Sequence, residues 1–188
     1  MDKRKRNNVF IVLEGLSGSG KTTIGKIVAK RIKGEFYRTP PSLFAGSFRN
    51  RIDKCASDSA RFLFYLVGVI QASDEISHIL ADRPVVCDRY LLTTLCYHRA
   101  LGVQINISDS AFRPLLRPNF TFLIVCKKAI RLKRLYSRGL SFNDKQERQI
   151  KIEQRFLMQY RKYNLIEVDN SSDDPEVTAK RIIVLLGE

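Results

Sequence analysis

The stretch Val9-Phe-Ile-Val-Leu-Glu-Gly-Leu-Ser-Gly-Ser-Gly-Lys-Thr-Thr23 decides the fold of this chain. Its apolar start, Val9–Leu13, predicts a buried strand, and a helical pattern follows the glycines. Between the two lies the spacing Gly15-x4-Gly20-Lys21-Thr22, which is that of a phosphate-binding loop. A strand before this motif and a helix after it is the context in which the motif is specific.

The chemistry of such a loop follows from its residue types. Glycines let backbone N–H groups converge on an anion, and the start of the next helix adds its positive dipole end. Lys21 is expected to reach the β- and γ-phosphates of ATP, and the Thr22 hydroxyl to hold Mg²⁺. The predicted ATP-binding residues are Gly15, Ser17, Gly18, Ser19, Gly20, Lys21, Thr22 and Thr23.

Length and composition favour one globular domain over residues 1–188, with a basic N-terminal tail at residues 1–8. The net charge of +14 fits a site for several phosphate groups; a nucleic-acid partner remains possible but is not favoured. The four cysteines show no zinc or disulfide spacing. No apolar stretch approaches the roughly 18 residues of a membrane span, so a cytoplasmic protein without a membrane partner is expected.

Short apolar runs alternate with longer helical patterns along the chain. Strands are predicted at Val9–Leu13, Glu35–Thr39, Pro84–Cys87, Phe120–Cys126 and Leu165–Val168. Helices are predicted at Lys21–Lys33, Ser59–Leu80, Arg89–Leu101, Ala129–Ser137, Asp144–Tyr163 and Pro175–Leu186. This alternation predicts a P-loop NTPase fold: a three-layer α/β/α domain with a mainly parallel five-stranded sheet. In such sheets ligands gather at the carboxyl ends of the strands.

A second constellation is Pro84-Val-Val-Cys-Asp88-Arg89-Tyr90, an apolar strand that ends in a carboxylate. In a phosphate-loop protein an aspartate at that position contacts Mg²⁺ directly or through water, so Asp88 joins Thr22 as a predicted metal residue. Arg89 follows at the same edge, where its guanidinium suits bidentate contact with a phosphoryl oxygen.

A basic helical pattern near the C-terminal third predicts a lid over residues 131–148. Arg131, Arg134 and Arg138 lie three and four residues apart and so share one helix face. Three cations on one face repel one another unless an anion lies on it, and the moving phosphate of ATP is such an anion. Arg134 and Arg138 therefore join Lys21 and Arg89 as predicted catalytic residues, with Gly139–Lys145 expected to be flexible.

These segments resemble the thymidylate kinases, a branch of the nucleoside monophosphate kinases. The resemblance rests on Phe10–Thr23 and on Val85-Val-Cys-Asp-Arg-Tyr-Leu-Leu-Thr-Thr-Leu-Cys-Tyr97, and it extends through Arg117–Leu123 and the lid to the C-terminal tail. It implies transfer of phosphate from ATP to a nucleoside monophosphate, with dTMP the leading acceptor. It also implies that Arg89 clamps the acceptor phosphate, that Phe64 stacks on the acceptor base, that Tyr97 lies near the acceptor, and that a homodimer is possible.

Three acceptor-side positions depart from that family. Ser17 stands where the family carries an Asp, and Arg38-Thr39-Pro40-Pro41 stands where it carries Thr-Arg-Glu-Pro. A helix arginine of many members falls at or near Gly68. Arg38 is the candidate to replace the displaced arginine, and it completes the predicted substrate-binding set of Arg38, Phe64, Arg89 and Tyr97.

Two other classes of function stay open from the sequence. A deoxynucleoside kinase or a polynucleotide 5′-kinase must deprotonate a hydroxyl and so usually needs a carboxylate near the acceptor. No Asp or Glu occurs in Thr39–Asn50, which favours an acceptor that is already an ionised phosphate. The third reading is a regulatory nucleotide-binding ATPase that has kept its donor site and lost its acceptor site.

Overall fold

The computed structural model describes residues 8–172 and 174–187. Its centre is a five-stranded sheet with the order β2-β3-β1-β4-β5, and all four strand pairs are parallel. The strands are β1 (Phe10–Glu14), β2 (Glu35–Arg38), β3 (Val85–Asp88), β4 (Phe120–Val125) and β5 (Ile166–Asp169). Each predicted strand is present within about two residues of its expected bounds.

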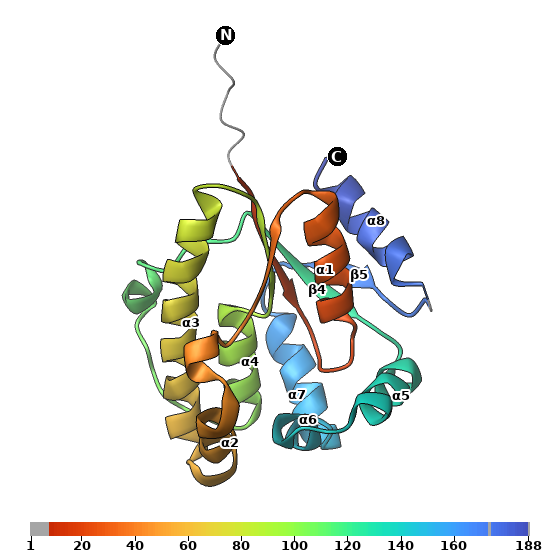
Figure 1. Cartoon of the computed structure of the whole chain (residues 1–188). Helices are drawn as coiled ribbons and strands as arrows, with labels where there is room; N and C mark the ends of the chain where they lie inside the picture. The colour runs from red at the N-terminus through yellow and green to blue at the C-terminus, as the bar shows by residue number, and fades with distance from the viewer. Residues whose placement is uncertain (1–7, 173, 188) are drawn as a thin grey trace.

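Helices cover both faces of the sheet (Figure 1). They are α1 (Lys21–Arg31), α2 (Gly46–Cys55), α3 (Asp58–Leu80), α4 (Leu91–Ala100), α5 (Lys128–Arg138), α6 (Phe142–Glu147), α7 (Ile150–Tyr160) and α8 (Pro175–Leu185). Two short 3₁₀ helices, η1 (Ser42–Phe44) and η2 (Asp109–Phe112), lie in connections. The expected three-layer α/β/α architecture is thus confirmed.

The alternating side chains of β1 separate two layers of core. Ile11 and Leu13 pack on one face, against α1 and α8. Phe10 and Val12 point to the other face, where they pack against α3. All five residues of β1 are buried, as expected for the central strand of a sheet that is covered on both faces.

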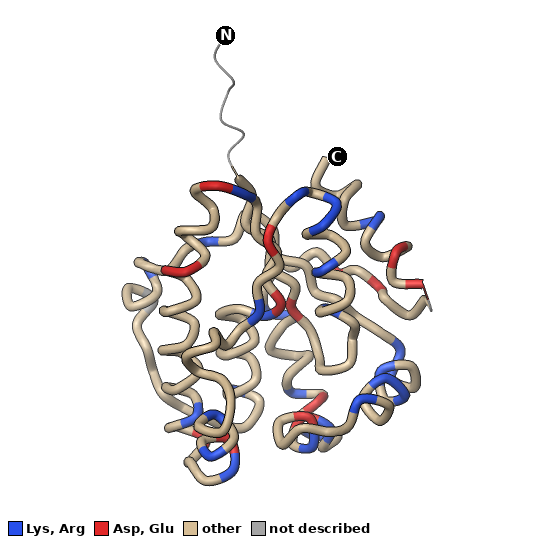
Figure 2. The backbone as a smooth tube through the Cα atoms, viewed as in Figure 1, with Lys and Arg blue, Asp and Glu red and all other residues tan. Residues whose placement is uncertain are grey.

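The strand register brings the functional ends of three strands together. Leu13 pairs with Asp88 between β1 and β3, and Arg38 pairs with Asp88 between β2 and β3. The phosphate loop leaves the same edge, because it follows β1 directly. Lys and Arg residues of α2 and α5 also lie at this end of the molecule (Figure 2).

Two helical predictions were wrong in detail. The single helix expected at Asp144–Tyr163 is two helices, α6 and α7, and α6 extends into the segment expected to be a flexible loop. The reason is a capping box: Ser141 and Asp144 satisfy each other's backbone N–H groups and start a helix at Phe142. The helix α2 was not predicted at all.

The basic N-terminal tail expected at residues 1–8 lies outside the described residues except for Asn8. The Asn8 side-chain amide donates to the carbonyl of Leu80 at 2.9 Å, at the end of α3. No helix among the described residues has the length and apolar character needed to cross a membrane.

Candidate active site

The phosphate loop packs so closely against its neighbours that a Cβ on any of its three glycines, Gly15, Gly18 and Gly20, would meet another atom within 3 Å. Gly18 and Gly20 have φ angles of 82° and 96°, in the left-handed region that disfavours other residues. A Cβ on Gly18 would lie 2.7 Å from Cγ of Leu135 in α5. A Cβ on Gly20 would lie 2.2 Å from Nδ2 of Asn170, just after β5. The loop is therefore held between the start of α1, α5 and the end of β5.

A cavity of about 970 Å³ opens beside the loop at the carboxyl ends of the strands. Most of the residues predicted from the sequence line it: Ser17, Gly18, Gly20, Lys21, Thr22, Thr23, Arg38, Asp88, Arg89, Tyr97, Arg134 and Arg138. Three do not. Gly15 and Ser19 line a smaller cavity on the other side of the phosphate loop, and Phe64 lines neither.

Lys21 is folded back onto the phosphate loop. Its Nζ donates to the carbonyls of Gly15 and Leu16 at 2.9 and 2.8 Å, and to Oγ of Ser19 at 3.3 Å. Burial, with a smaller contribution from the charge of Arg89, lowers the Lys21 pKa to about 7. An anion in the cavity would favour the charged form, so this amine is suited to meet phosphate oxygens.

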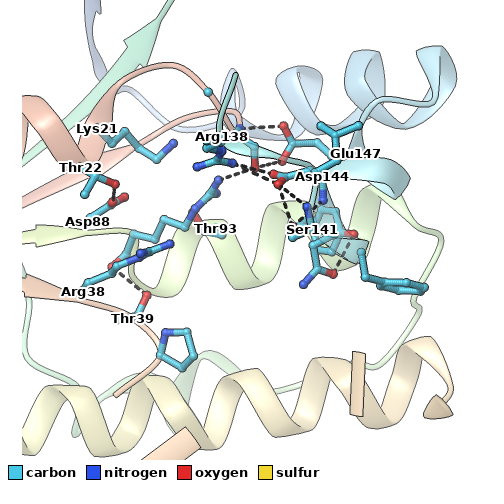
Figure 3. Close-up of a pocket in the computed structure, with 18 of the residues that line it drawn as sticks. Lys21, Thr22, Arg38, Thr39, Asp88, Thr93, Arg138, Ser141, Asp144 and Glu147 are labelled. Atoms are coloured by element: carbon cyan, nitrogen blue, oxygen red, sulfur yellow. Dashed lines mark hydrogen bonds and ion pairs between the residues drawn. The ribbon is translucent and has the colours of Figure 1, made fainter. Parts of the chain in front are cut away.

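Thr22 and Asp88 lie together although 66 positions separate them in the chain (Figure 3). The Thr22 hydroxyl donates to Oδ2 of Asp88. The other carboxylate oxygen, Oδ1, is buried and has no hydrogen-bond partner among the described residues. A hydroxyl beside an unpartnered carboxylate oxygen is a donor set that suits Mg²⁺, which takes oxygen ligands and keeps several waters. No cluster of three or more His, Cys, Asp or Glu ligands is found in the described part of the chain.

Arg89 follows Asp88 in a left-handed backbone conformation, with a φ of 71°. Such a conformation is uncommon outside glycine and here turns the guanidinium toward the phosphate loop. Nη2 donates to Oγ of Ser17 at 3.0 Å and Nη1 to Oγ1 of Thr93 at 3.3 Å. Burial opposes the charge, but neighbouring groups, with the Glu147 carboxylate first among them, raise the Arg89 pKa.

Glu14, which the sequence analysis passed over, secures the strand end from which the loop departs. It is fully buried, and its carboxylate accepts from the backbone N–H groups of Tyr90 and Thr93 at 3.1 and 3.2 Å. The Thr93 hydroxyl and the Tyr160 hydroxyl also donate to it. Burial raises the Glu14 pKa despite these donors. A charged residue inside an apolar run was the only signal in the sequence.

A second missed carboxylate, Glu147 of α6, contacts the phosphate loop. It accepts from the backbone N–H of Ser17 at 2.7 Å and from the Ser17 hydroxyl at 2.9 Å. Ser17 stands at the position where the thymidylate kinases, which the sequence resembles, carry an Asp. In this chain a carboxylate still reaches that point, but it comes from a helix 130 positions away.

The three lid arginines do not form one free cationic face, which corrects the expectation drawn from their spacing. Arg131 is buried, pairs with Glu147 at 3.6 Å and with Glu153, and donates to the carbonyl of Ser17 at 3.0 Å. Its ion pairs make it a structural link between α5, α7 and the phosphate loop. Burial with two carboxylates explains why the spacing alone was misleading.

Arg134 and Arg138 remain at the cavity, each with its own partners. Arg134 donates to the carbonyls of Asn170 and Ser172 at 3.1 and 3.0 Å, beside the phosphate loop. Arg138, half exposed, pairs with the carboxylate of Asp144 at 3.0 Å. An Arg–carboxylate pair of this kind can exchange its carboxylate for a phosphate with little change in geometry.

The acceptor end of the cavity contains a polar group that was also missed. Asp53 of α2 accepts from the Tyr65 hydroxyl at 2.7 Å and from the Asn143 amide at 3.0 Å, and it lies 3.6 Å from Arg49. Thr39–Asn50 contains no Asp or Glu, but Asp53 follows three residues later and reaches the cavity. Each Asp53 oxygen accepts a hydrogen bond from another side chain, so this carboxylate takes part in the contact among α2, α3 and α6.

The aromatic residue that α3 turns into the cavity is Tyr65, not Phe64. One residue along a helix rotates the side chain by about 100°. Phe64 instead makes edge contacts with Phe44 and Phe48, with ring centroids 5.6 and 5.8 Å away. Tyr97 does reach the cavity, where its hydroxyl donates to Oε1 of Gln146 at 3.1 Å.

Two of the departures from the family pattern also lie together. Gly68 is buried on α3, and a Cβ there would lie 3.5 Å from Cβ of Pro40. A long arginine side chain at Gly68 would therefore meet the Pro40–Phe44 segment. Arg38, at the end of β2, lines the cavity from that side.

The sequence and the fold were compared with those of known proteins. The thymidylate kinase family model matches residues 13–182. A probable thymidylate kinase of Methanocaldococcus jannaschii is 30% identical over 183 residues, which cover 94% of this chain and 95% of the relative. Among solved structures, the thymidylate kinase of Candida albicans superposes with a TM-score of 0.76 over 96% of this chain and 92% of that one, at 18% identity. A deoxyadenosine kinase from M. mycoides superposes with a TM-score of 0.67 over 95% and 98%, at 16% identity.

A parallel sheet with a phosphate loop after its central strand, an aspartate at the neighbouring strand end and arginines of α5 at the same cavity defines the class of P-loop kinases. Within that class, the chain belongs to the thymidylate kinase family. It is thus an ATP-dependent nucleoside monophosphate kinase, as the sequence analysis expected. The two solved structures are too distant in sequence to show more than the shared fold.

The structural role of Arg131 can be tested by its effect on stability. Arg131→Met removes the buried guanidinium that pairs with both Glu147 and Glu153, so we expect a loss of about 3–5 kcal/mol in the free energy of unfolding. Urea denaturation measures this loss. The control Arg155→Met, on the exposed side of α7, should change it by less than about 0.5 kcal/mol. If Arg131→Met is as stable as wild type but has lost phosphotransfer activity, the structural role is contradicted and Arg131 acts in phosphotransfer instead.

Proposed function

We propose that this chain transfers the γ-phosphate of ATP to dTMP, giving dTDP. The observation that carries the proposal is a cavity lined by Lys21 and the phosphate loop, by Arg89, which donates to Ser17 of that loop, and by Tyr97 and Tyr65. Family membership supports dTMP as the acceptor.

The groups that line the cavity have separate tasks in this proposal. Lys21 and the loop amides would hold the β- and γ-phosphates, while Arg89 would clamp the phosphate of the acceptor. The acceptor phosphate is already ionised, so the reaction needs positioning and neutralisation of charge rather than a general base. Arg134 and Arg138, next to the loop and at the lid, would neutralise charge on the transferring group.

We further infer that the whole chain acts as one domain, with α5 and α6 as the lid, and that the activity is cytoplasmic. Arg138 and Asp144 lie at the two sides of the lid turn, and Glu147 connects the lid to the phosphate loop. When ATP binds, its phosphates would compete with Asp144 for Arg138. The four cysteines are free, which fits a reducing compartment.

A coupled ADP-release assay tests the acceptor. We expect strong stimulation by dTMP and weaker stimulation by dUMP, UMP, CMP, AMP and GMP. Thymidine, deoxyadenosine and a 5′-hydroxyl oligonucleotide should give none, because they lack the ionised phosphate that Arg89 would clamp. Stimulation by a nucleoside alone would replace the proposal with a deoxynucleoside kinase, and ATP turnover without any acceptor effect would indicate a regulatory ATPase.

Lys21→Ala should lower phosphotransfer by about 100-fold or more, since it removes a preorganised cation from the transferring phosphate. The assay is kcat with saturating ATP and dTMP, with circular dichroism to confirm the fold. Lys30→Ala, on the exposed side of the same helix, is the matched control and should keep its rate. Undiminished activity of Lys21→Ala would remove the phosphate-loop assignment.

We propose that Thr22 and Asp88 hold Mg²⁺, which would neutralise phosphate charge when bound. Asp88→Asn should lower the rate and shift the Mg²⁺ dependence to higher concentration, because an amide is a weaker ligand than a carboxylate. Initial rates measured across a Mg²⁺ series give this shift. Asp169→Asn, at the end of β5, is the control and should leave the Mg²⁺ response unchanged. An unaltered response of Asp88→Asn would contradict the metal role.

We also propose a homodimer through the outer face of α3. Leu63, Val67 and Ile70 are 47%, 51% and 46% exposed and lie four and three residues apart, so they form one apolar stripe. A second copy can cover this stripe with its own in a two-fold symmetric contact.

Val67→Glu places a charge in the middle of the stripe and should convert the dimer to a monomer, as measured by sedimentation velocity. Val184→Glu, on the 70% exposed site in α8, should leave the dimer intact. A wild-type protein that stays monomeric at tens of micromolar would contradict the proposed interface.

A further inference from the structure

His98 is a buried polar residue of the cavity that the proposed reaction does not use. It lies in the last turn of α4, is 2% exposed and lines the acceptor end of the cavity. Its Nδ1 is 2.8 Å from the carbonyl of Thr94 in the same helix. A carbonyl only accepts hydrogen bonds, so Nδ1 must carry the proton and donate.

This hydrogen bond decides the chemistry of the other ring nitrogen. With the proton on Nδ1 of a neutral ring, Nε2 carries a lone pair and can only accept. Burial lowers the His98 pKa to about 4, so the ring is neutral around pH 7. Nε2 is buried and has no partner among the described residues, which is unusual for a buried polar atom.

Aromatic side chains surround His98, and some of them also line the cavity. Phe62, Tyr65 and Tyr97 have ring centroids 5.4, 5.8 and 5.3 Å from that of His98. Tyr65 and Tyr97 line the cavity with it. Aromatic faces of this kind stack on nucleobases without selecting among them, so selection requires a hydrogen-bonding atom.

The position of His98 along α4 fits the dimensions of a nucleotide. Arg89 lies just before the first residue of α4, and His98 lies in its last turn, roughly 13 Å away along the helix axis. The side chains of a helix lean toward its N-terminus, which shortens the span from the imidazole to Arg89. An acceptor whose phosphate is held by Arg89 can thus extend its base toward His98.

We propose that Nε2 of His98 accepts a hydrogen bond from the ring N–H of the acceptor base and so selects a 2,4-dioxopyrimidine. This inference rests on the proposed function and names the group that reads the base. Thymine and uracil present N3–H at that edge, whereas cytosine presents a lone pair at N3. Two lone pairs facing each other in a buried site repel, so cytosine is rejected. His98 is a binding residue in this account and takes no part in phosphotransfer.

Two amide substitutions distinguish the roles of the two ring nitrogens of His98. His98→Asn keeps a donor that can reach the Thr94 carbonyl but has nothing at the position of Nε2. His98→Gln places an amide oxygen near the position of Nε2. The probes are dTMP, dCMP and 3-methyl-dTMP, which lacks the N3–H, and calorimetry without ATP measures their affinities.

We expect wild type to bind dTMP about 10-fold to 100-fold more tightly than dCMP or 3-methyl-dTMP, the size of one buried hydrogen bond. His98→Asn should lose this preference, with a higher KM for dTMP and a kcat close to that of wild type. His98→Gln should keep a large part of the preference. Thermal melting of both variants shows whether they fold.

Three outcomes would overturn the inference: no preference in wild type, a full preference in folded His98→Asn, or equal loss in both variants, which would indicate a packing role. If His98→Asn does not fold, the test is the preference for dTMP over dCMP and 3-methyl-dTMP in wild type and in His98→Gln. Loss of that preference in a folded His98→Gln would contradict the inference. Failure of the proposed function is distinguishable from failure of this inference, because no monophosphate would then stimulate ADP release by wild type. A wild type that phosphorylates dTMP but ignores N3 methylation keeps the function and loses the role of His98.

Discussion

The parallel pairing of β1 with β3 is the constraint on which the active site depends. Because Leu13 and Asp88 are partners in register, the loop that follows β1 and the carboxylate that ends β3 leave the sheet at the same point. The contact between the Thr22 hydroxyl and Asp88 follows from that register. A slip by one residue would turn every side chain of the strand to the other face, so the buried pattern of β1 protects the site as well as the core.

Buried carboxylates then connect this edge to the helices around it. Glu14 joins the end of β1 to the start of α4 and to α7, and so holds the backbone turn that presents Arg89. Glu147 and Arg131 join the lid helices to the phosphate loop through Ser17. Each of these charges is buried with several donors or an ion-pair partner, which is the condition under which burial of a charge is tolerated. The lid and the phosphate loop are thereby parts of one connected network.

The arginines show how far sequence reasoning extends. Arg131, Arg134 and Arg138 have the same residue type and share one helical spacing, and the spacing alone treats them as equals. In the structure one is an internal ion-pair partner, one is bound to backbone carbonyls and one is half exposed in the lid. The difference arises from residues on α7 and after β5, far away in the chain, and no local pattern contains it.

What the sequence by itself determined was the five strands in chain order, most of the helices between them, the parallel sheet, the phosphate loop and Asp88 with Arg89. These features depend on local periodicity and on a motif in which neighbouring residues act together. Only the tertiary structure decided that Tyr65 rather than Phe64 faces the cavity and that Asp53 and Glu147 line it. It also decided that Glu14 holds the start of α4, and that Nε2 of His98 has no partner among the described residues. The physical reason is that a buried polar group is defined by partners that lie far away along the chain, and those partners are set by packing and register rather than by local spacing.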